Sequence, residues 1–334
     1  MSTSSIGSLR VVIRAAVALA AVLAAPAPLQ AQPDPAANYP NKPIRMIIPF
    51  GAGGGNDIFA RLIGAKLTEY LGQQVVIENR PGAAGRIATD FVAKQPADGY
   101  TLLAAATGPM SIAAAIYSKL SYHPTKSFIP LTMTANFPLI MISPINHPAK
   151  TVKDIVAYAK ANPNKSNYAS TSPSFVVATE LLKLKTGMPA VAIPLKSSAE
   201  MVLCVIQQNC LIALPDGPPA IPQIKAGKVR ALAVTGSERS PQLPNVPSMA
   251  EAGYPEVNTK LWAGFFAPAK TPPAIAKKLE AAMRRAIADP GVNAKLREMA
   301  VNPGGGSSAE FRKMIDQDIK NYVAVVKAAK LKFE

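Results

Sequence analysis

A short apolar run followed by a glycine-rich turn, at residues 44–57, constrains the fold of this chain most. Residues 44–48 are almost all apolar and suit a buried parallel strand. Four glycines occupy positions 51 and 53–55, and an amphipathic segment follows at 58–71. Asn56 or Asp57 can cap that helix. The pattern therefore predicts a strand, a tight turn and the start of a helix.

The glycine turn is a candidate anion site. Glycine has no Cβ, so its backbone N–H can approach a ligand closely, and the first turn of a helix adds free N–H donors and partial positive charge. A tight connection without any ligand explains the spacing equally well. A nucleotide site is less favoured, because position 56 lacks the last glycine of the dinucleotide fingerprint and no Gly-Lys-Ser/Thr follows.

The first 31 residues read as a cleavable signal peptide. Arg10 and Arg14 precede an apolar run at 15–25, and cleavage is expected after Ala31. The run is too short to span a membrane, and no later stretch of about 18 apolar residues occurs. We therefore expect an exported, soluble protein, with an uncleaved anchor as the alternative.

The charge balance of the exported chain is basic. Residues 1–31 hold two of the 36 Lys and Arg residues and none of the 20 acidic ones, which leaves a net charge of +14. That sign suits an anionic solute, although the basic residues can equally form a solvated surface. Nucleic-acid binding is not expected, because the chain has no run of five or six basic residues and little aromatic interleaving.

After the first helix, strands and helices alternate as in parallel α/β sheets. In the first part we expect strands at 75–77 and 100–106 and helices at 85–93 and 111–120. The second part repeats the rhythm, with strands at 167–170, 190–194, 210–214 and 229–235 and helices at 151–161, 173–185 and 198–208. A return loop follows at 236–255, then an apolar run at 261–267 and helices at 272–288, 292–299 and 308–330.

Two parallel-sheet lobes joined by two crossings imply a cleft between them, since ligands in such folds lie at the C-terminal ends of strands. The last helix is expected to start with a capping box formed by Ser307 and Glu310.

Seven motifs then occur in a characteristic order. They are Tyr-Pro-x-Lys-Pro-Ile-Arg at 39–45, Pro-Phe-x-Ala-Gly-Gly-Gly-x-Asp at 49–57, Glu-Asn-Arg-Pro-Gly-Ala at 78–83, Asp-Gly-Tyr-Thr-Leu-Leu at 98–103, Asn-Tyr-Ala-Ser at 167–170, Lys-Ala-Gly-Lys-Val-Arg-Ala-Leu-Ala-Val-Thr at 225–235 and Val-Pro-Ser-Met-Ala-Glu-Ala-Gly at 246–253. In this the chain resembles the periplasmic substrate-binding proteins of tripartite tricarboxylate transporters, also called Bug proteins, over nearly its whole exported length.

The resemblance implies a two-lobed Venus-flytrap fold of the type II periplasmic binding proteins. The first α/β lobe is expected at 39–140 and 260–334, and the second at 141–259. The function implied is capture of a small carboxylate in the periplasm and its delivery to the permease subunits of a membrane transporter. No catalysis, cofactor or metal is implied, and we expect a monomer. A secreted enzyme that uses the same anion loop is the alternative.

Carried over by position, the resemblance assigns the carboxylate grip to the first lobe and further ligand contacts to the second. The expected ligand-binding residues are Phe50, Ala52, Gly53, Gly54, Asp57, Thr107, Gly108, Ser170, Thr171, Ser172 and Asp216. The chain departs from the family after residue 170, where a glycine-rich loop with a histidine is usual, and at 194–197, where Pro-Leu-Lys-Ser replaces Pro-Tyr-Lys-Gly. The part of the site that selects the far end of the ligand is therefore left open.

Other chemistry-bearing residues give weak signals. His123 and His147 both precede prolines in loops, away from any nucleophile motif, and two histidines and two cysteines are not at metal-ligand spacing. Asp216 can bind a ligand hydroxyl or ammonium group or cap a helix, and Lys196 can pair with a second ligand carboxylate or lie in solvent. Export makes a disulfide between Cys204 and Cys210 possible, and two buried thiols are the alternative.

Overall fold

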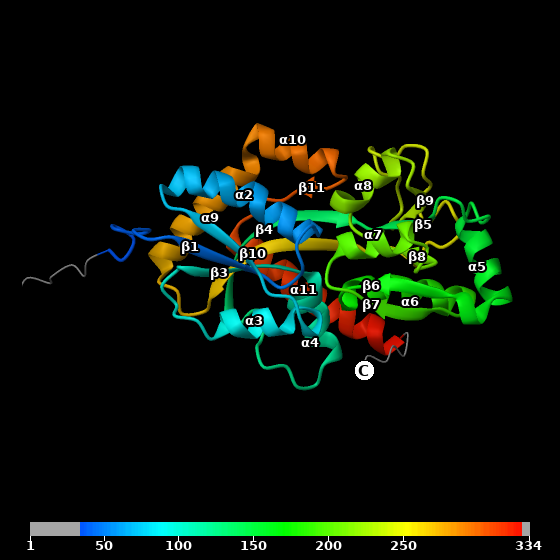
Figure 1. Ribbon diagram of the computed structural model, residues 1–334. Helices are drawn as coiled ribbons and strands as arrows, with labels where there is room; N and C mark the ends of the chain where they lie inside the picture. The colour runs from blue at the N-terminus through cyan, green and yellow to red at the C-terminus, as the bar shows by residue number, and fades with distance from the viewer. Residues whose placement is uncertain (1–33, 329–334) are drawn as a thin grey trace, which may run out of the picture.

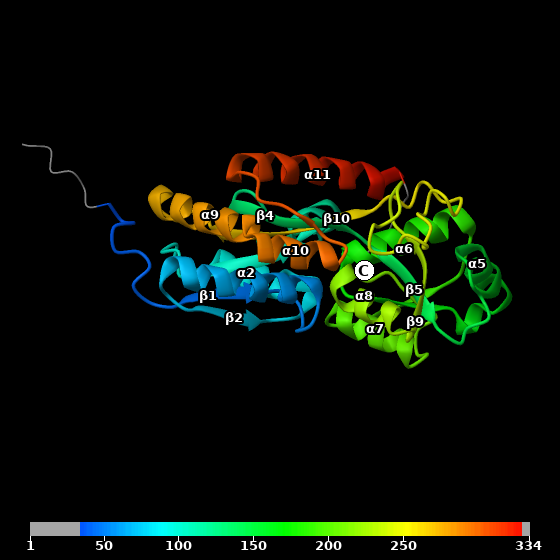
Figure 2. The same ribbon diagram turned by 90° about the horizontal axis from the view of Figure 1, so that it is seen from above.

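Two mixed β-sheets form the centres of two lobes that lie end to end along the molecule (Figures 1 and 2). The computed structural model describes residues 34–328, so the expected signal peptide at 1–31 lies outside the described residues. The first sheet has the strand order β11 (Asn302–Pro303), β4 (Phe128–Pro138), β10 (Lys260–Pro268), β3 (Thr101–Ala106), β1 (Ile44–Ile48) and β2 (Val75–Asn79). The second has the order β7 (Val191–Pro194), β6 (Asn167–Ser170), β8 (Ile212–Ala213), β5 (Ile140–Pro144) and β9 (Val229–Val234).

Helices cover the sheets of both lobes (Figure 1). Those of the first lobe are α2 (Gly55–Leu71), α3 (Arg86–Ala93), a π-helical turn η2 (Gly108–Ile112), α4 (Ala113–Ile116), α9 (Pro273–Ala288), α10 (Pro290–Glu298) and α11 (Ser308–Ala328). Those of the second lobe are α5 (Val152–Ala161), α6 (Pro173–Thr186), α7 (Ser198–Ile206) and α8 (Gly217–Lys225). Short 3₁₀ turns lie at Ala83–Gly85 and Pro163–Lys165. None of the helices described within residues 34–328 has the length and apolar character needed to cross a bilayer.

Strand β1 is buried on both faces, as its continuous apolar sequence predicts. Met46 and Ile48 belong to the core that contains Phe59 of α2. Ile47 belongs to the core on the other face, with Phe311 of α11. The alternation places α2 and α11 on opposite sides of the sheet, so β1 and the turn after it are fixed from both sides.

The pairing direction differs from the expected parallel sheets. β1 pairs in parallel with β2 and β3, but β10 is antiparallel to both β3 and β4. In the second lobe β5 is antiparallel to β8 and β9. The reason is topological: β10 and β5 belong to the crossings between the lobes, and each enters its sheet from the other lobe instead of returning through a helix.

Strand β4 was not anticipated from the sequence pattern, and one expected helix has different bounds. Strand β4 starts at Phe128 and contains Pro130. Proline has no N–H to donate to a neighbouring strand, so its presence does not predict the interior of a strand. β11 pairs only with Ala135 and Asn136, so the part of β4 that holds Pro130 has no strand on that side and tolerates a proline. The helix expected at 111–120 begins earlier, with Pro109 in its first turn, and ends at Ile116.

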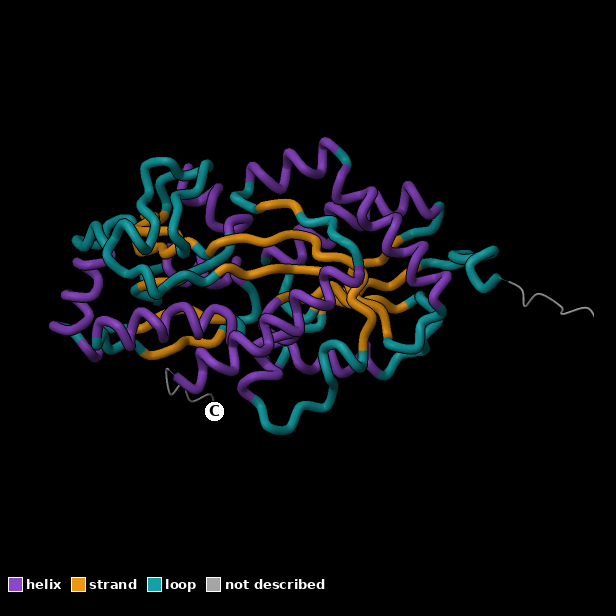
Figure 3. Tube along the Cα trace, turned by 180° about the vertical axis from the view of Figure 1, so that it is seen from behind, coloured by secondary structure: helices purple, strands orange, loops and turns teal. Residues whose placement is uncertain are grey.

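The two long strands β4 and β10 carry the chain between the lobes side by side (Figure 3). β4 ends at Pro138 and β5 begins at Ile140, while β10 begins at Lys260. Thr235 joins these crossings, because its hydroxyl accepts from the N–H of Leu139 at 2.8 Å and donates to the carbonyl of Thr259 at 2.6 Å. We propose that the lobes divide near residues 140 and 260, where the chain changes sheets.

Candidate functional site

A small cavity lies between the lobes at the C-terminal ends of the strands. Its walls come from both lobes and consist of Phe50, Gly54, Gly55, Asn56, Ala106, Phe137, Thr171, Ser172, Ser174, Phe175, Ser197, Ser198, Asp216 and Leu261. The enclosed space is about 30 Å³. A cavity that holds benzene measures about 150 Å³, so the lobes must separate to admit a ligand of several carbon atoms. We refer to this space as the cleft.

Four helices begin at the cleft. The N-cap residues of α2, α6, α7 and α8 are Gly54, Ser172, Ser197 and Asp216, and all four line its walls. The first turn of each helix has N–H groups without a partner inside the helix and carries partial positive charge. One of these helices comes from the first lobe and three from the second. Closure of the lobes therefore concentrates N–H donors around one small volume.

The side chains of the cleft supply no positive charge. Among the described residues that line it, none is a lysine, arginine or histidine, and Asp216 is the one charged residue. The rest of the wall is apolar, from Phe50, Phe137, Phe175 and Leu261, or carries hydroxyl and amide groups. An anion in this cleft would be held by backbone N–H groups, hydroxyls and the Asn56 amide.

Asp216 lies at the start of α2 although it belongs to the opposite lobe. Its side chain is buried, with 4 % of the residue exposed, and the hydroxyl of Ser198 donates to its Oδ1 at 2.7 Å. Burial raises the pKa of Asp216 to about 6, against the opposing effect of hydrogen bonds from Ser198 and from the Gly55 N–H. A Cβ on Gly55 would lie 2.3 Å from Oδ2 of Asp216, so only glycine permits this approach.

Two other glycines of the turn donate backbone hydrogen bonds, one within the turn and one to the opposite lobe. The N–H of Gly53 donates to Oδ2 of Asp57 at 3.0 Å, and the N–H of Gly51 donates across the lobes to the carbonyl of Lys196 at 2.8 Å. Burial raises the pKa of Asp57, but hydrogen bonds from Arg61, Gly53 and Asn79 outweigh it and leave the pKa lowered. Asp57 is thus a charged support of the turn.

The expected capping of α2 by Asn56 or Asp57 was wrong. The helix begins at Gly55, Gly54 is the N-cap, and no side chain caps it. Both residues lie inside the first turn, because the glycines allow the helix to start before the amphipathic pattern becomes visible.

The capping box at α11 was confirmed: Glu310 accepts from the N–H of Ser307, and Ser307 accepts from the N–H of Glu310.

Two buried polar atoms of the cleft wall have no hydrogen-bond partner within the described residues. They are Nδ2 of Asn56, on α2 of the first lobe, and Oγ of Ser174, on α6 of the second. A buried donor without a partner costs about 1–3 kcal/mol, so such groups are rare unless something else binds them. The two residues line the cleft from opposite lobes, and their amide and hydroxyl groups are suited to a ligand with acceptor oxygens.

The structure brings together part of the residue set expected from the sequence. Five of the eleven residues line the cleft: Phe50, Gly54, Thr171, Ser172 and Asp216. The other six are not in its wall: Ala52, Gly53, Asp57, Thr107, Gly108 and Ser170. Thr107 supports the wall from behind, because its hydroxyl accepts from the N–H of Trp262 at 2.8 Å. Gly108 packs closely on Ser172 and Ser174, whose hydroxyls lie 3.0 and 2.9 Å from where its Cβ would be.

Sequence reasoning missed Asn56, Ser174 and Ser198. Asn56 was considered only as a cap, and Ser198 only as the start of a helix. Ser197 and Ser198 follow strand β7 and begin α7, so the rule that ligands lie at the C-terminal ends of parallel strands could have included them. Ser174 carried no separate signal, because it lies one residue inside the first turn of α6.

The other candidate residues lie outside the cleft. Nδ1 of His123 accepts from the N–H groups of Thr125 and Lys126, Nδ1 of His147 accepts from Ala149, and burial lowers the pKa of both histidines. The side chain of Lys196 is exposed. Cys204 and Cys210 form a disulfide with a Cα–Cα distance of 5.3 Å. Residues 34–328 contain no group of three metal-ligating side chains.

Comparison with known proteins finds relatives along almost the whole chain. The profile of a family described as "tripartite tricarboxylate transporter family receptor" matches residues 59–331. Protein BugT of Bordetella pertussis is 33 % identical over 307 residues, covering 90 % of this chain and 94 % of BugT. Two solved structures from Rhodopseudomonas palustris are also similar. Rpa4515 with adipate is 33 % identical with a TM-score of 0.84, covering 88 % of this chain and 99 % of that one. MatC with bound malate is 28 % identical with a TM-score of 0.83, covering 86 % and 100 %.

Proposed function

The chain belongs to the tripartite tricarboxylate transporter receptor family, and on this premise we propose that it captures a small carboxylate in the periplasm and delivers it to a membrane permease. The carboxylate is held in the cleft between the lobes. The relatives with adipate and malate support this class of ligand. We infer that the receptor works as a monomer and that the permease subunits of such a transporter are its partners.

One observation carries the proposal: four helix N-termini converge on a cleft whose lining, among residues 34–328, holds no cationic side chain and includes two polar atoms without a hydrogen-bond partner in that range. Backbone N–H groups at helix starts bind carboxylates without a counter-ion, as they bind phosphates. Asn56 and Ser174 add one donor from each lobe. A ligand carboxylate between them would satisfy both atoms and would join the lobes in the closed arrangement.

The alternative, a secreted enzyme, is less well supported. The hydroxyl of Ser198 donates to Asp216 and has no histidine beside it that could act as a base. Both histidines use Nδ1 to accept from backbone N–H groups in loops away from the cleft. We therefore infer that the protein acts by binding and release.

Native mass spectrometry of the protein purified from the periplasm tests the proposal. We expect one small carboxylic acid per protein molecule, released on denaturation and identified by its mass. A Ser174→Ala variant prepared in parallel should carry less of the same acid. Protein that carries no acid, and that gains none when incubated with a panel of mono-, di- and tricarboxylates, would contradict the proposal.

A further inference from the structure

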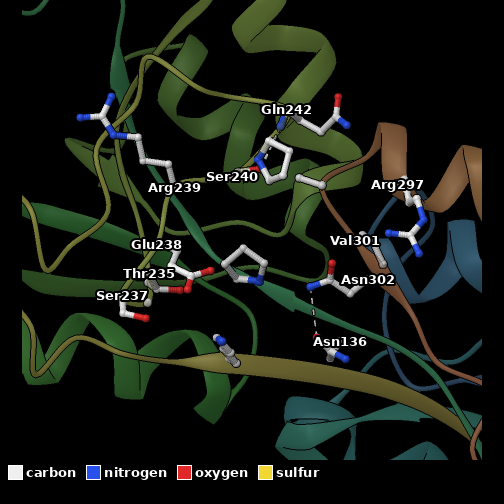
Figure 4. A pocket seen from close by; sticks show the side chains of 15 residues that line it. Asn136, Thr235, Ser237, Glu238, Arg239, Ser240, Gln242, Arg297, Val301 and Asn302 are labelled. Atoms are coloured by element: carbon white, nitrogen blue, oxygen red, sulfur yellow. Dashed lines mark hydrogen bonds between the residues drawn. The ribbon is translucent and has the colours of Figure 1, made fainter.

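A second cavity, of about 310 Å³, lies where the two crossing strands leave the first lobe (Figure 4). We call it the hinge pocket. Asn136 and Pro138 of β4 and Lys260 of β10 line it, whereas Phe137 and Leu261 line the cleft. Successive residues of a strand point to opposite faces. The hinge pocket and the cleft are therefore on opposite faces of the same two strands.

This placement couples the two cavities mechanically. The loop that starts at Thr235 forms the second-lobe wall of the hinge pocket, and the segment from Arg297 to Asn302 forms the first-lobe wall (Figure 4). Thr235 also ties the crossing strands together near Leu139 and Thr259. A rotation of the lobes about these strands that opens the cleft must bring the walls of the hinge pocket together. An occupant of the hinge pocket resists that rotation.

Ten of the 15 residues that line the hinge pocket are polar, and their side chains carry more positive than negative charge. Lys260 and Arg297 form no ion pair with any residue in the range 34–328, while Arg239 is paired with Glu251. Among the described residues of the wall, Glu238 is the one acidic residue and none is aromatic. Neutral donors such as Asn302 and Ser237 line the pocket together with the cations. Two cations with neutral donors fit an oxyanion, and the lack of rings gives a nucleobase nothing to stack on.

We propose that the hinge pocket binds a small multivalent oxyanion and that its occupation holds the lobes in the closed arrangement. Lys260 and Arg297 provide the charge-assisted hydrogen bonds, one from the crossing strand and one from α10. The site is separate from the carboxylate cleft, so the receptor would sense a second solute through its hinge. By linkage, an anion that favours the closed arrangement also slows the release of whatever the cleft holds.

Titration with inorganic pyrophosphate at low ionic strength tests the proposal. Binding can be measured by calorimetry and by tryptophan fluorescence. Trp262 is the single tryptophan of the chain and lies on β10 two residues from Lys260, so its fluorescence reports on the hinge pocket. We expect saturable binding of one pyrophosphate per chain. Arg297→Gln should weaken it about ten- to a hundredfold, the usual effect of losing a charge-assisted hydrogen bond.

Lys295→Gln is the matched control, because Lys295 is an exposed cation on the same helix outside the pocket. It should change the affinity less than about threefold. Equal losses in both variants, a stoichiometry other than one, or no saturable binding would overturn the site. Loss of binding in Ser198→Ala would move the pyrophosphate to the cleft and would also overturn it.

Small-angle X-ray scattering at saturating pyrophosphate tests the coupling. The closed structure should fit the scattering curve. A curve that only a more open arrangement of the lobes can fit would overturn the claim that the hinge pocket holds the lobes closed.

Discussion

At the residue scale, the unusual feature is the position of Asp216, whose carboxyl group occupies the start of α2, where a ligand carboxylate is expected to bind. Asp216 reaches α2 from the second lobe and lies against Gly55. A ligand carboxylate brought to the same N–H groups must displace Asp216 or lie beside it. When two carboxylates lie close together without a cation, repulsion between their charges favours protonation of one of them. Binding of a ligand carboxylate can therefore be coupled to the uptake of a proton by Asp216.

The pH dependence of stability should reveal Asp216. Its pKa is about 6 in the folded protein, above the ordinary value of 3.8. Between these values the folded state holds the proton more tightly than the unfolded chain, so the free energy of unfolding falls as pH rises. The pKa difference corresponds to about 3 kcal/mol. Urea unfolding of the wild type and of Asp216→Asn between pH 4 and 7 should show the wild type losing stability relative to the variant. Parallel curves would contradict the assignment.

Ser174 should trade stability for binding. Its hydroxyl is buried at the cleft without a partner, so Ser174→Ala removes an unsatisfied group and should leave the free energy of unfolding unchanged or raise it by about 1 kcal/mol. Carboxylate affinity, measured by calorimetry, should fall about fivefold or more. Ser111→Ala is the control, because its hydroxyl is also buried without a partner but does not line the cleft. Equal affinity losses in both variants would exclude a specific role for Ser174.

At the scale of elements, local signals predicted the helices well and the strand pairing poorly. α6 and α7 begin at Pro173 and Ser198, where the sequence predicts them, and the capping box of α11 is visible in the sequence. The antiparallel entry of β10 leaves no trace in its apolar run, because periodicity records burial and not direction. The convergence of four helix starts depends on lobe closure, which no local pattern encodes.

The Thr235 hydroxyl should stabilise the protein by joining the two crossings through its hydrogen bonds to Leu139 and Thr259. Thr235→Val leaves the N–H of Leu139 and the carbonyl of Thr259 without their hydroxyl partner, and both lie in a buried region. The free energy of unfolding should fall by about 2 kcal/mol. Thr235→Ser keeps the hydroxyl and should recover most of it. Urea unfolding of the two variants compares them directly. A Thr235→Val protein as stable as the wild type, or a Thr235→Ser protein that loses as much as Thr235→Val, would contradict this role of the hydroxyl.

At the scale of the whole molecule, the protein is two lobes hinged on a pair of strands, with the cleft on one face and the hinge pocket on the other. The cleft as it stands is too small for a ligand of several carbons, so binding must include separation and reclosure of the lobes. A net charge of +14 on residues 32–334 would speed the approach of an anion over longer distances, an effect that salt screens. The rate of association therefore depends on the surface charge of the whole protein, whereas the affinity depends on the residues of the cleft.

Calorimetry of carboxylate binding to Gly55→Ala tests the central claim, that helix starts in the cleft hold the ligand, most directly. The added Cβ would lie 2.3 Å from Asp216 and would push the two lobes apart at the start of α2. Gly72→Ala adds the same methyl group at the C-cap of that helix, where a Cβ has no neighbour within 4 Å but the φ of +67° strains the backbone. This variant therefore tests whether a loss of stability alone weakens binding. We expect every carboxylate that binds the wild type to lose affinity at least about tenfold in Gly55→Ala and to keep it in Gly72→Ala. A folded Gly55→Ala protein that binds the same acids within about threefold of the wild type would contradict the account.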